Sequence, residues 1–147
     1  MDEKSNKNCC FAPPENFYLQ DAWLIGAHKF FCFQDQNGNV SIFIGIEEMA
    51  STVAAWLKKI KQNEDVCDLE TLEIERCGKK GKSARYFDRI NGARIYEERY
   101  TLSKDGKRQF FVAIEERLCG DKIENEGGRY ALNGFNATSF LNSIRFF

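Results

Sequence analysis

One stretch decides the fold: residues 94–118, with the sequence RIYEERYTLSKDGKRQFFVAIEERL. It predicts two long strands joined at Ser103-Lys104-Asp105-Gly106-Lys107, because Asp-Gly suits a type I′ turn, whose two central residues need positive φ. One face of the first strand carries Tyr96, Glu98, Tyr100 and Leu102, and one face of the second carries Phe110, Val112, Ile114 and Leu118. A hairpin alone is barely stable in water, so other elements must cover this apolar face.

Two segments predict helices that can provide this cover. In Met49–Lys61 the apolar residues form one helical stripe, which consists of Met49, Val53, Trp56, Leu57 and Ile60. We expect Glu47 and Glu48 to open this helix, because acidic side chains suit the positive end of the helix dipole. A second, shorter helix is expected over Asn136–Ile144, with Asn136 as its N-cap.

The rest of the chain predicts further strands and tight turns. The expected strands are Leu24–Phe33, Val40–Ile46, Leu69–Arg76 and Ser83–Ile90, with turns at Asn37-Gly38 and Asn91-Gly92 and a basic loop at Cys77–Lys82. Short links between consecutive strands indicate antiparallel pairing. The predicted fold class is therefore α+β: an antiparallel sheet of about six strands covered by two helices, an α/β/α sandwich. Residues 1–15 are expected to form a flexible tail, and residues 16–147 a single domain.

Composition limits the classes of function. The chain has 147 residues, 43% of them hydrophobic, and a formal net charge of −1, which predicts a globular domain without a global field for nucleic acid or anionic membrane. No run approaches the roughly 18 apolar residues that span a bilayer. The polar start at residues 1–8 has no apolar region behind it. We therefore expect a cytoplasmic protein, or else a periplasmic lipoprotein-like domain from which a signal has been removed.

The six cysteines are dispersed and contain no Cys-x-x-Cys motif. They stand at positions 9, 10, 32, 67, 77 and 119. A small secreted chain with an even number of cysteines would suggest a disulfide framework. Here the sparse spacing and the polar start favour reduced thiols that pack as small apolar side chains.

His28 is the single histidine and the first candidate for nucleophilic chemistry. A Cys/His pair needs the imidazole within hydrogen-bond reach of the sulfur. His28 and Cys32 lie four residues apart on one predicted strand, which separates them by roughly 13 Å. This geometry argues against the pair, and the spacing of the other possible ligands does not predict a metal site around His28.

Two glutamate doublets provide the second candidate. Glu97-Glu98 and Glu115-Glu116 lie on the two strands of the central hairpin, where cross-strand neighbours could form a carboxylate pair for acid/base chemistry. Arg99 and Arg117 follow Glu97 and Glu115 by two residues and share their faces. Alternating charges on a solvated sheet face are the simpler interpretation.

The loop Gly78-Lys79-Lys80-Gly81-Lys82 is the third candidate. A phosphate-binding P-loop has different spacing and leads into a helix, whereas this loop leads into a predicted strand. With Arg85 and Arg89 the loop could form a modest anion patch. The absence of evident stacking aromatics beside it argues against nucleic-acid binding. The sequence therefore predicts no catalytic, cofactor-binding or metal-binding residues, and no cofactor.

The order of elements resembles the PsbP/DcrB-like superfamily. The resemblance rests on Asp21-Ala22-Trp23 before a hairpin, a helix ending in Leu57-x-x-Ile60, four strands, and a closing helix with Phe140-Leu141-x-Ser143-Ile144-x-Phe146. It implies an α/β/α sandwich and a largely non-catalytic role. Members of that superfamily include photosystem-associated proteins, a Ran-binding nuclear import factor, bacterial lipoproteins and chaperones of type VI secretion effectors. The cysteine content and the polar segment Cys119–Gly128 depart from those chaperones.

These observations predict a non-catalytic protein-binding domain. The first hypothesis is a chaperone or adaptor for a secreted bacterial effector, which requires a concave apolar groove. An alternative from another class is an immunity protein that neutralises a bacterial toxin through a flatter charged patch that includes Glu97 and Glu115. A small enzyme or nucleotide-binding protein is the least favoured. The expected partner is another protein, without a membrane span, and the sequence leaves the oligomeric state open.

Overall fold

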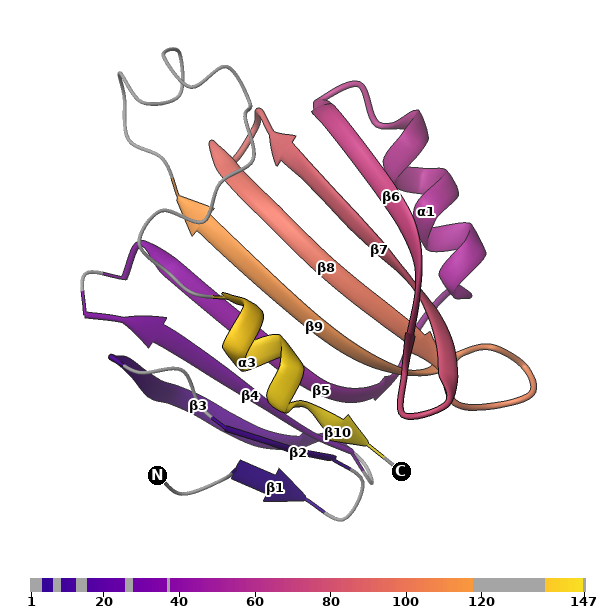
Figure 1. Ribbon diagram of the computed structural model, residues 1–147. Helices are drawn as coiled ribbons and strands as arrows, with labels where there is room; N and C mark the ends of the chain where they lie inside the picture. The colour runs from indigo at the N-terminus through magenta and orange to yellow at the C-terminus, as the bar shows by residue number, and fades with distance from the viewer. Residues whose placement is uncertain are drawn as a thin grey trace.

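A computed structural model of the chain describes residues 4–6, 9–12, 16–25, 28–36, 38–117 and 137–146. Its main body is a seven-stranded antiparallel sheet in the order β3-β4-β5-β9-β8-β7-β6 (Figure 1). The strands are β3 (Phe17–Ile25), β4 (His28–Asp35), β5 (Val40–Glu48), β6 (Val66–Arg76), β7 (Lys79–Asp88), β8 (Ala93–Thr101) and β9 (Arg108–Arg117). Helix α1 (Val53–Gln62) connects β5 to β6 at the far edge, so the chain returns through β7 and β8 until β9 pairs with β5.

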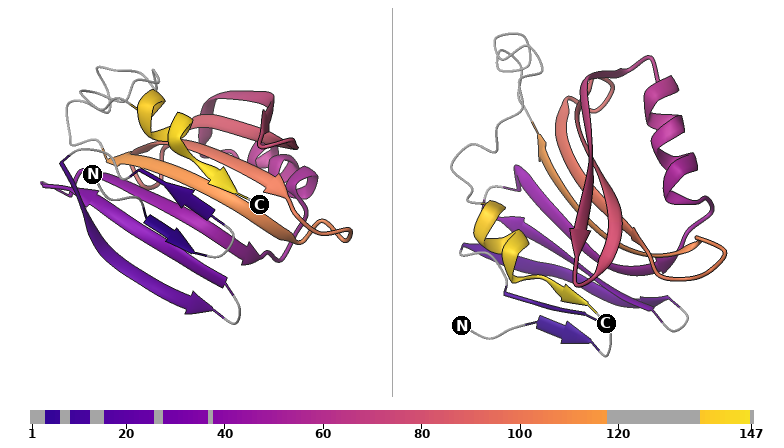
Figure 2. Two further views of the ribbon diagram at one scale, coloured as in Figure 1. Left: turned by 60° about the horizontal axis from the view of Figure 1, so that its bottom comes forward. Right: turned by 45° about the vertical axis from the view of Figure 1, so that its right-hand side comes forward.

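A second sheet of three short strands involves both ends of the chain. It consists of β1 (Lys4–Asn6), β2 (Cys9–Phe11) and β10 (Arg145–Phe146), with β2 in the centre. Helix α3 (Ala137–Ser143) leads directly into β10. Figure 2 shows α3, β10 and this small sheet on the concave side of the curved main sheet, whereas α1 lies on the opposite side.

The main core lies on the concave face. Alternate residues of β5 and β9 provide its floor, because side chains in a strand point to opposite faces in turn. The fully buried members there include Ile42, Ile44, Val112 and Ile114. Phe11, Phe140 and Phe146 close the core from above, with Phe11 in edge-on contact with Phe31, Phe33 and Phe140 at centroid distances of 5.5, 5.8 and 6.0 Å.

Helix α1 has a smaller core of its own. Thr52 is the N-cap, and its hydroxyl oxygen accepts a hydrogen bond from the backbone N–H of Ala55 at 3.2 Å. The predicted stripe is buried at Val53, Trp56, Leu57 and Ile60, where it packs on Ala84 of β7, but the helix begins at Val53 and Met49 lies before it. Glu47 and Glu48 end β5 instead of opening the helix, so that prediction is wrong.

The predicted α/β/α sandwich is wrong as well, since the fold is β-rich. Strand neighbours are about 4.8 Å apart, so seven strands are roughly 30 Å wide. A helix rises about 1.5 Å per residue, which makes α3 roughly 10 Å long and α1 roughly 15 Å long. Neither helix can cover a face alone: α1 contacts β6, β7 and β8, and the strands β1, β2 and β10 share the concave face with α3.

Two predicted segments differ at their turns. The expected single strand Leu24–Phe33 is divided between β3 and β4, which pair with each other from Phe17↔Asp35 to Ile25↔His28. The expected basic loop at Cys77–Lys82 is a tight turn followed by strand, because Cys77 and Gly78 both have positive φ (53° and 77°) and β7 begins at Lys79. A two-residue turn of this kind is the type I′ hairpin that Asp105-Gly106 was expected to form.

The central hairpin brings the two predicted apolar faces together, but with a different turn. Tyr96 faces Ile114, Glu98 faces Val112 and Tyr100 faces Phe110. At its end, only Gly106 of the Asp105-Gly106 pair has positive φ, and the Gly106 N–H donates to the Ser103 carbonyl at 3.1 Å. The link is therefore a longer loop. Leu118 and Asn136, which the sequence placed in this strand and at the last N-cap, lie outside the described residues.

Within the first fifteen residues the structure describes β1, β2 and Ala12. Phe11 is fully buried and the Ala12 N–H donates to the Ser143 hydroxyl at 2.9 Å. This part of the segment predicted as a tail thus contributes a side chain to the main core, beside the C-terminal helix.

Candidate functional site

Two polar clusters occupy opposite faces of β8. The doublet Glu97-Glu98 explains this division, because adjacent strand residues point to opposite sides of a sheet. Glu98 belongs to a network inside the concave core, and Glu97 to a patch on the other face, beside α1. The second doublet behaves in the same way: Glu116 is buried in the concave face and Glu115 lines the opposite patch.

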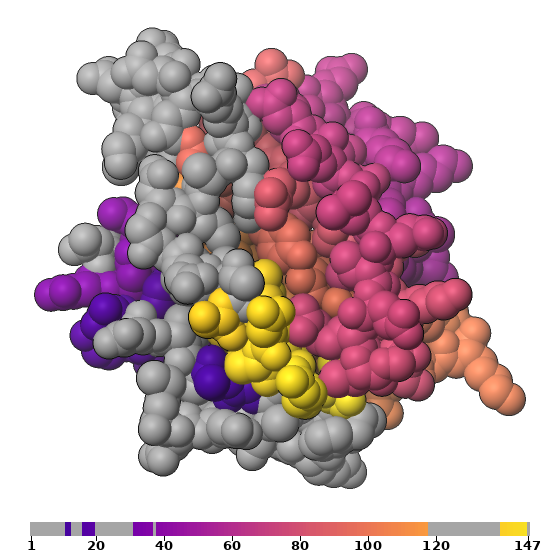
Figure 3. Space-filling view, in the orientation of Figure 1, coloured from indigo at the N-terminus to yellow at the C-terminus, as the bar shows by residue number. Residues whose placement is uncertain are grey.

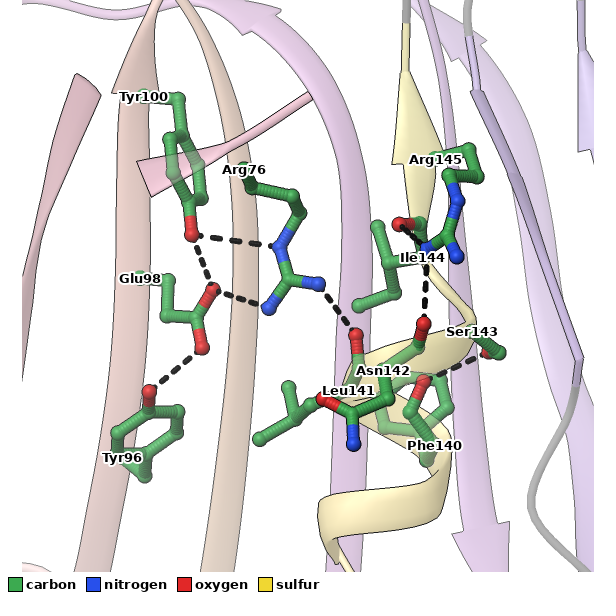
Figure 4. A network of polar contacts seen from close by, with 10 residues as sticks. All are labelled: Arg76, Tyr96, Glu98, Tyr100, Phe140, Leu141, Asn142, Ser143, Ile144 and Arg145. Carbon is green, nitrogen blue, oxygen red and sulfur yellow. Dashed lines mark hydrogen bonds and ion pairs between the residues drawn. The ribbon is translucent and has the colours of Figure 1, made fainter. Parts of the chain in front are cut away.

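The interior network centres on the Glu98 carboxylate, which is 3% exposed (Figure 4). Its oxygens accept hydrogen bonds from the hydroxyls of Tyr96 at 2.5 Å and Tyr100 at 2.7 Å, and from Arg76 Nη2 at 3.0 Å. Arg76 also donates to the Tyr100 hydroxyl at 3.3 Å and to the Leu141 carbonyl at 2.5 Å. One edge-strand arginine thus ties α3 to the centre of the sheet.

This network is suited to structure, not to acid/base chemistry. Burial, followed by the negative charge of Glu98, raises the pKa of both Tyr96 and Tyr100. The two hydroxyls therefore stay protonated and serve as donors. In Figure 3 the C-terminal segment (yellow) lies directly against the β6–β7 region, in agreement with the hydrogen bond from Arg76 to the Leu141 carbonyl. The cluster holds two elements together, since Arg76 of β6 bonds to both Glu98 of β8 and the Leu141 carbonyl of α3.

A second buried ion pair stands further along the same face. Arg94 and Glu116 are directly opposite in the β8–β9 register, with 3.4 Å between Nη1 and Oε1. Their side chains are 1% and 8% exposed. A buried charge needs a partner, so this pair fixes the register of two strands more than it adds stability.

The cluster on the opposite face is more open, and we name it the open-face patch. It consists of Phe43, Glu47, Met49, Glu97, Arg99, Phe111, Ala113 and Glu115, which line a shallow depression of about 280 Å³. In the described part of the chain, α1 is the one element on this side of the sheet, and it lies over β6 to β8 (Figure 2). The patch is therefore a sheet surface over β5, β9 and β8 that the described elements leave uncovered.

Arg99 and Trp56 form the border of the patch toward α1. The Arg99 guanidinium lies 4.4 Å from the centroid of the Trp56 ring, and its Nε donates to Glu97 Oε2 at 2.5 Å. Stacking on an aromatic face and bonding to a carboxylate together fix the guanidinium plane. Arg99 and Glu97 retain only 18% and 12% side-chain exposure. The pair is thus held rigidly at the edge of the depression.

The two carboxylates of the patch have perturbed pKa values. Burial raises the pKa of Glu97, and the nearby Glu115 carboxylate adds to this effect, while Arg99 opposes it. Burial also raises the pKa of Glu115, with Asp88 adding and Arg117 opposing. Half-buried acids beside aromatic rings in a depression are a common mark of a functional surface.

The predicted interpretation of these charges requires correction. Glu97 and Glu115 do share a face, but Glu97 faces Ala113 and Glu115 faces Ile95, so the two acids are diagonal neighbours. Glu97 is also too buried for a solvated sheet face. The sequence places Glu98 in the apolar stripe with Tyr96 and Tyr100. A glutamate in such a stripe indicates a buried hydrogen-bond acceptor, and the prediction of a solvated charged face overlooked this signal.

The other sequence candidates lie elsewhere. His28 begins β4, four residues from Cys32 on one strand, and no cluster of three potential metal ligands exists among the described residues. Lys82 from the predicted basic loop is paired with Glu73 at 2.5 Å. Arg85 lies over the Tyr96 ring at 5.3 Å, and so faces the concave side. The structure thus does not bring the basic residues together with open aromatics.

In the described part of the chain, Cys32, Cys67 and Cys77 form no disulfide bond; Cys77 is exposed and the other two are partly buried. The Cys67 Sγ lies 3.7 Å from the Phe87 carbonyl, as expected for a weak S–H donor.

Comparison with known proteins adds no family to this picture. The chain matches no model of a known protein family, and no curated protein is significantly similar to it. The resemblance to the PsbP/DcrB-like superfamily stays a prediction. None of the described helices has the length and apolar character that a membrane crossing requires.

Proposed function

We propose that this protein works by binding another protein through the open-face patch, without catalysing a reaction. The observation that carries the proposal is the position of Glu97 and Glu115, two partly desolvated acids with raised pKa values beside Phe43 and Phe111, on a sheet face that the described elements leave uncovered. A sheet surface that keeps acids partly desolvated beside aromatics is suited to a cationic side chain with apolar neighbours. Aromatic anchors with a central charge usually dominate the affinity of such interfaces.

Of the two binding roles predicted from the sequence, this geometry favours the immunity protein. A chaperone that shields an apolar segment needs an apolar groove, but the apolar concave face is filled by the chain's own Phe11, Phe140, Ile144 and Phe146. The open-face patch is shallow and acidic, as expected for a surface that blocks a basic toxin. We therefore propose a protein that neutralises a basic toxin by covering its cationic surface.

The proposal is tested with a charge variant of the patch. Glu97→Gln combined with Glu115→Lys changes the charge of the patch without forcing a cation into the more buried position of Glu97. The matched control is Glu64→Gln combined with Glu48→Lys, which makes the same change of charge at two exposed positions outside the patch. Circular dichroism and thermal unfolding first establish that both variants fold.

Wild-type protein and both variants then serve as baits in lysate from the native host. We expect one basic protein to be captured by the wild type, about tenfold less by the patch variant, and with lower yield at high salt, because exposed charge pairs are screened. Co-expression of that protein should be toxic, and the wild type should suppress the toxicity. Equal capture by the wild type and the patch variant, or steady turnover of a small substrate, contradicts the proposal.

A further inference from the structure

Among the described strands, β6 presents a long edge without a neighbour on its outer side. It is the last strand of the main sheet, and no described strand pairs with its outer side. It has 11 residues and contains no proline. A register shift between Cys67 and Glu70, with Asp68 at a φ of 55°, distorts its beginning, but Glu70–Arg76 pairs regularly with β7. Native proteins usually shorten, cover or interrupt such an edge, because its free N–H and C=O groups pair readily with another strand.

The side chains of β6 are strongly acidic. Asp68, Glu70, Glu73 and Glu75 stand against one base, Arg76, which is engaged in the interior network. If two copies of β6 paired edge to edge, acidic side chains would face one another, and like charges in opposite positions destabilise a sheet. A second copy of this chain is therefore a poor occupant of this edge, and a basic strand is a good one.

The inner side of β6 shows which partner its charges accept. Glu73 is directly opposite Lys82 and Glu75 opposite Lys80, with 2.5 Å between the Glu73 carboxylate and Lys82 Nζ. Lysines at alternate positions of β7 thus already pair with the acidic side chains of β6 within the chain. An incoming strand with the same alternation would meet the same two acids from the outer side.

The surroundings of the edge provide room for such side chains. A cleft of about 530 Å³ lies between the first turn of α1 and the β6–β7 hairpin, and its wall contains Glu73 and Glu75 together with their cross-strand partners Lys82 and Lys80. Side chains opposite these two acids on an added strand would point to the same face, toward this cleft. On the other face the Leu72 side chain is 65% exposed and can contact an apolar side chain of the added strand. An exposed leucine does not protect an edge strand from pairing, so protection does not account for its position.

We propose that β6 is a docking edge for an extended basic segment of another protein. The segment adds as an eighth strand, with Lys or Arg facing Glu73 and Glu75 and an apolar residue facing Leu72. Main-chain hydrogen bonds provide the general affinity, and the alternating acids select the sequence. This edge is separate from the open-face patch, so it constitutes a second binding surface.

A synthetic peptide of nine residues tests the proposal. Lysine alternates in it with valine and threonine, and its binding is followed by fluorescence anisotropy and by hydrogen exchange of the full-length protein. We expect saturable binding and slower exchange of the backbone amides in residues 70–76. The double variant Glu73→Gln/Glu75→Gln should bind about tenfold more weakly, since two cross-strand charge pairs are lost. The matched control Glu48→Gln/Glu64→Gln, at two exposed positions outside β6, should bind like the wild type.

A second peptide separates strand addition from simple charge attraction. Its lysines are unchanged, but alternate backbone nitrogens are methylated, so it cannot form a ladder. We expect its binding to be lost. Equal binding of the methylated peptide, or protection of amides outside β6, overturns the proposal. The patch variant Glu97→Gln/Glu115→Lys should bind the first peptide normally, so a failure here and a failure of the proposed toxin-binding function give different results.

Discussion

Replacing Arg76 with methionine should destabilise the protein far more than removing a typical surface charge. Methionine retains most of the aliphatic volume but removes the donors to Glu98, Tyr100 and Leu141, at 3.0, 3.3 and 2.5 Å. Glu98, with a side chain 4% exposed, would lose its cationic partner.

The magnitude follows from the burial of the pair. Breaking a buried ion pair by removing one partner costs about 3–5 kcal/mol, because the remaining charge stays desolvated. Arg76 is 15% exposed, so we expect a value near the lower end, about 3 kcal/mol. The control Lys82→Met breaks the pair with Glu73, whose side chain is 85% exposed, and such surface pairs contribute about 0–1 kcal/mol.

Urea unfolding monitored by circular dichroism measures both variants. With a typical slope of about 1–3 kcal/mol per molar, Arg76→Met should lower the midpoint by about 1–3 M, and Lys82→Met by much less. In the double variant Arg76→Met/Glu98→Gln the loss should be smaller than in Arg76→Met alone, since no uncompensated carboxylate remains. Equal midpoints for Arg76→Met and Lys82→Met would refute the assigned role of the network.

Two further predictions concern pH and backbone packing. The pKa values of Glu97 and Glu115 are raised above 4.5 in the folded protein, which therefore binds more protons than the unfolded chain. The free energy of unfolding should thus fall as the pH rises from about 4.5 toward neutral. The melting temperature, measured against pH, should fall less steeply in Glu115→Gln than in the wild type. An unchanged slope in this variant would count against this reasoning. Gly81→Ala should destabilise by roughly 1–3 kcal/mol in urea unfolding, because the added Cβ would lie 2.5 Å from both the Arg99 carbonyl and the Tyr100 ring. Gly78 lies in open space at a φ of 77°, so Gly78→Ala should lower the free energy of unfolding by only about 1–2 kcal/mol. A larger loss at Gly78 than at Gly81 would be inconsistent with the packing described.

Part of the candidate site follows from the sequence. Period-two alternation places Glu97 and Glu115 on one face and Glu98 on the other, and the structure has that arrangement. Local pattern does not reveal how deeply each face is buried. The desolvation that raises the pKa of Glu97 comes from the surrounding fold, which includes Trp56 on α1 beside Arg99. These elements are far apart in the chain, so the nature of the patch could not be read from either segment alone.

The sequence by itself determined the local features: the apolar face shared by the two strands of the central hairpin, the buried stripe of α1, and the apolar alternation of β5. Each depends on side chains within one strand, one helix or one tight turn. The tertiary structure alone decided that β9 pairs with β5, that the two ends of the chain close the concave core, and that β6 stays at an edge. These outcomes depend on packing between segments tens of residues apart, where many pairings satisfy the same alternation and only the filling of the common core distinguishes them.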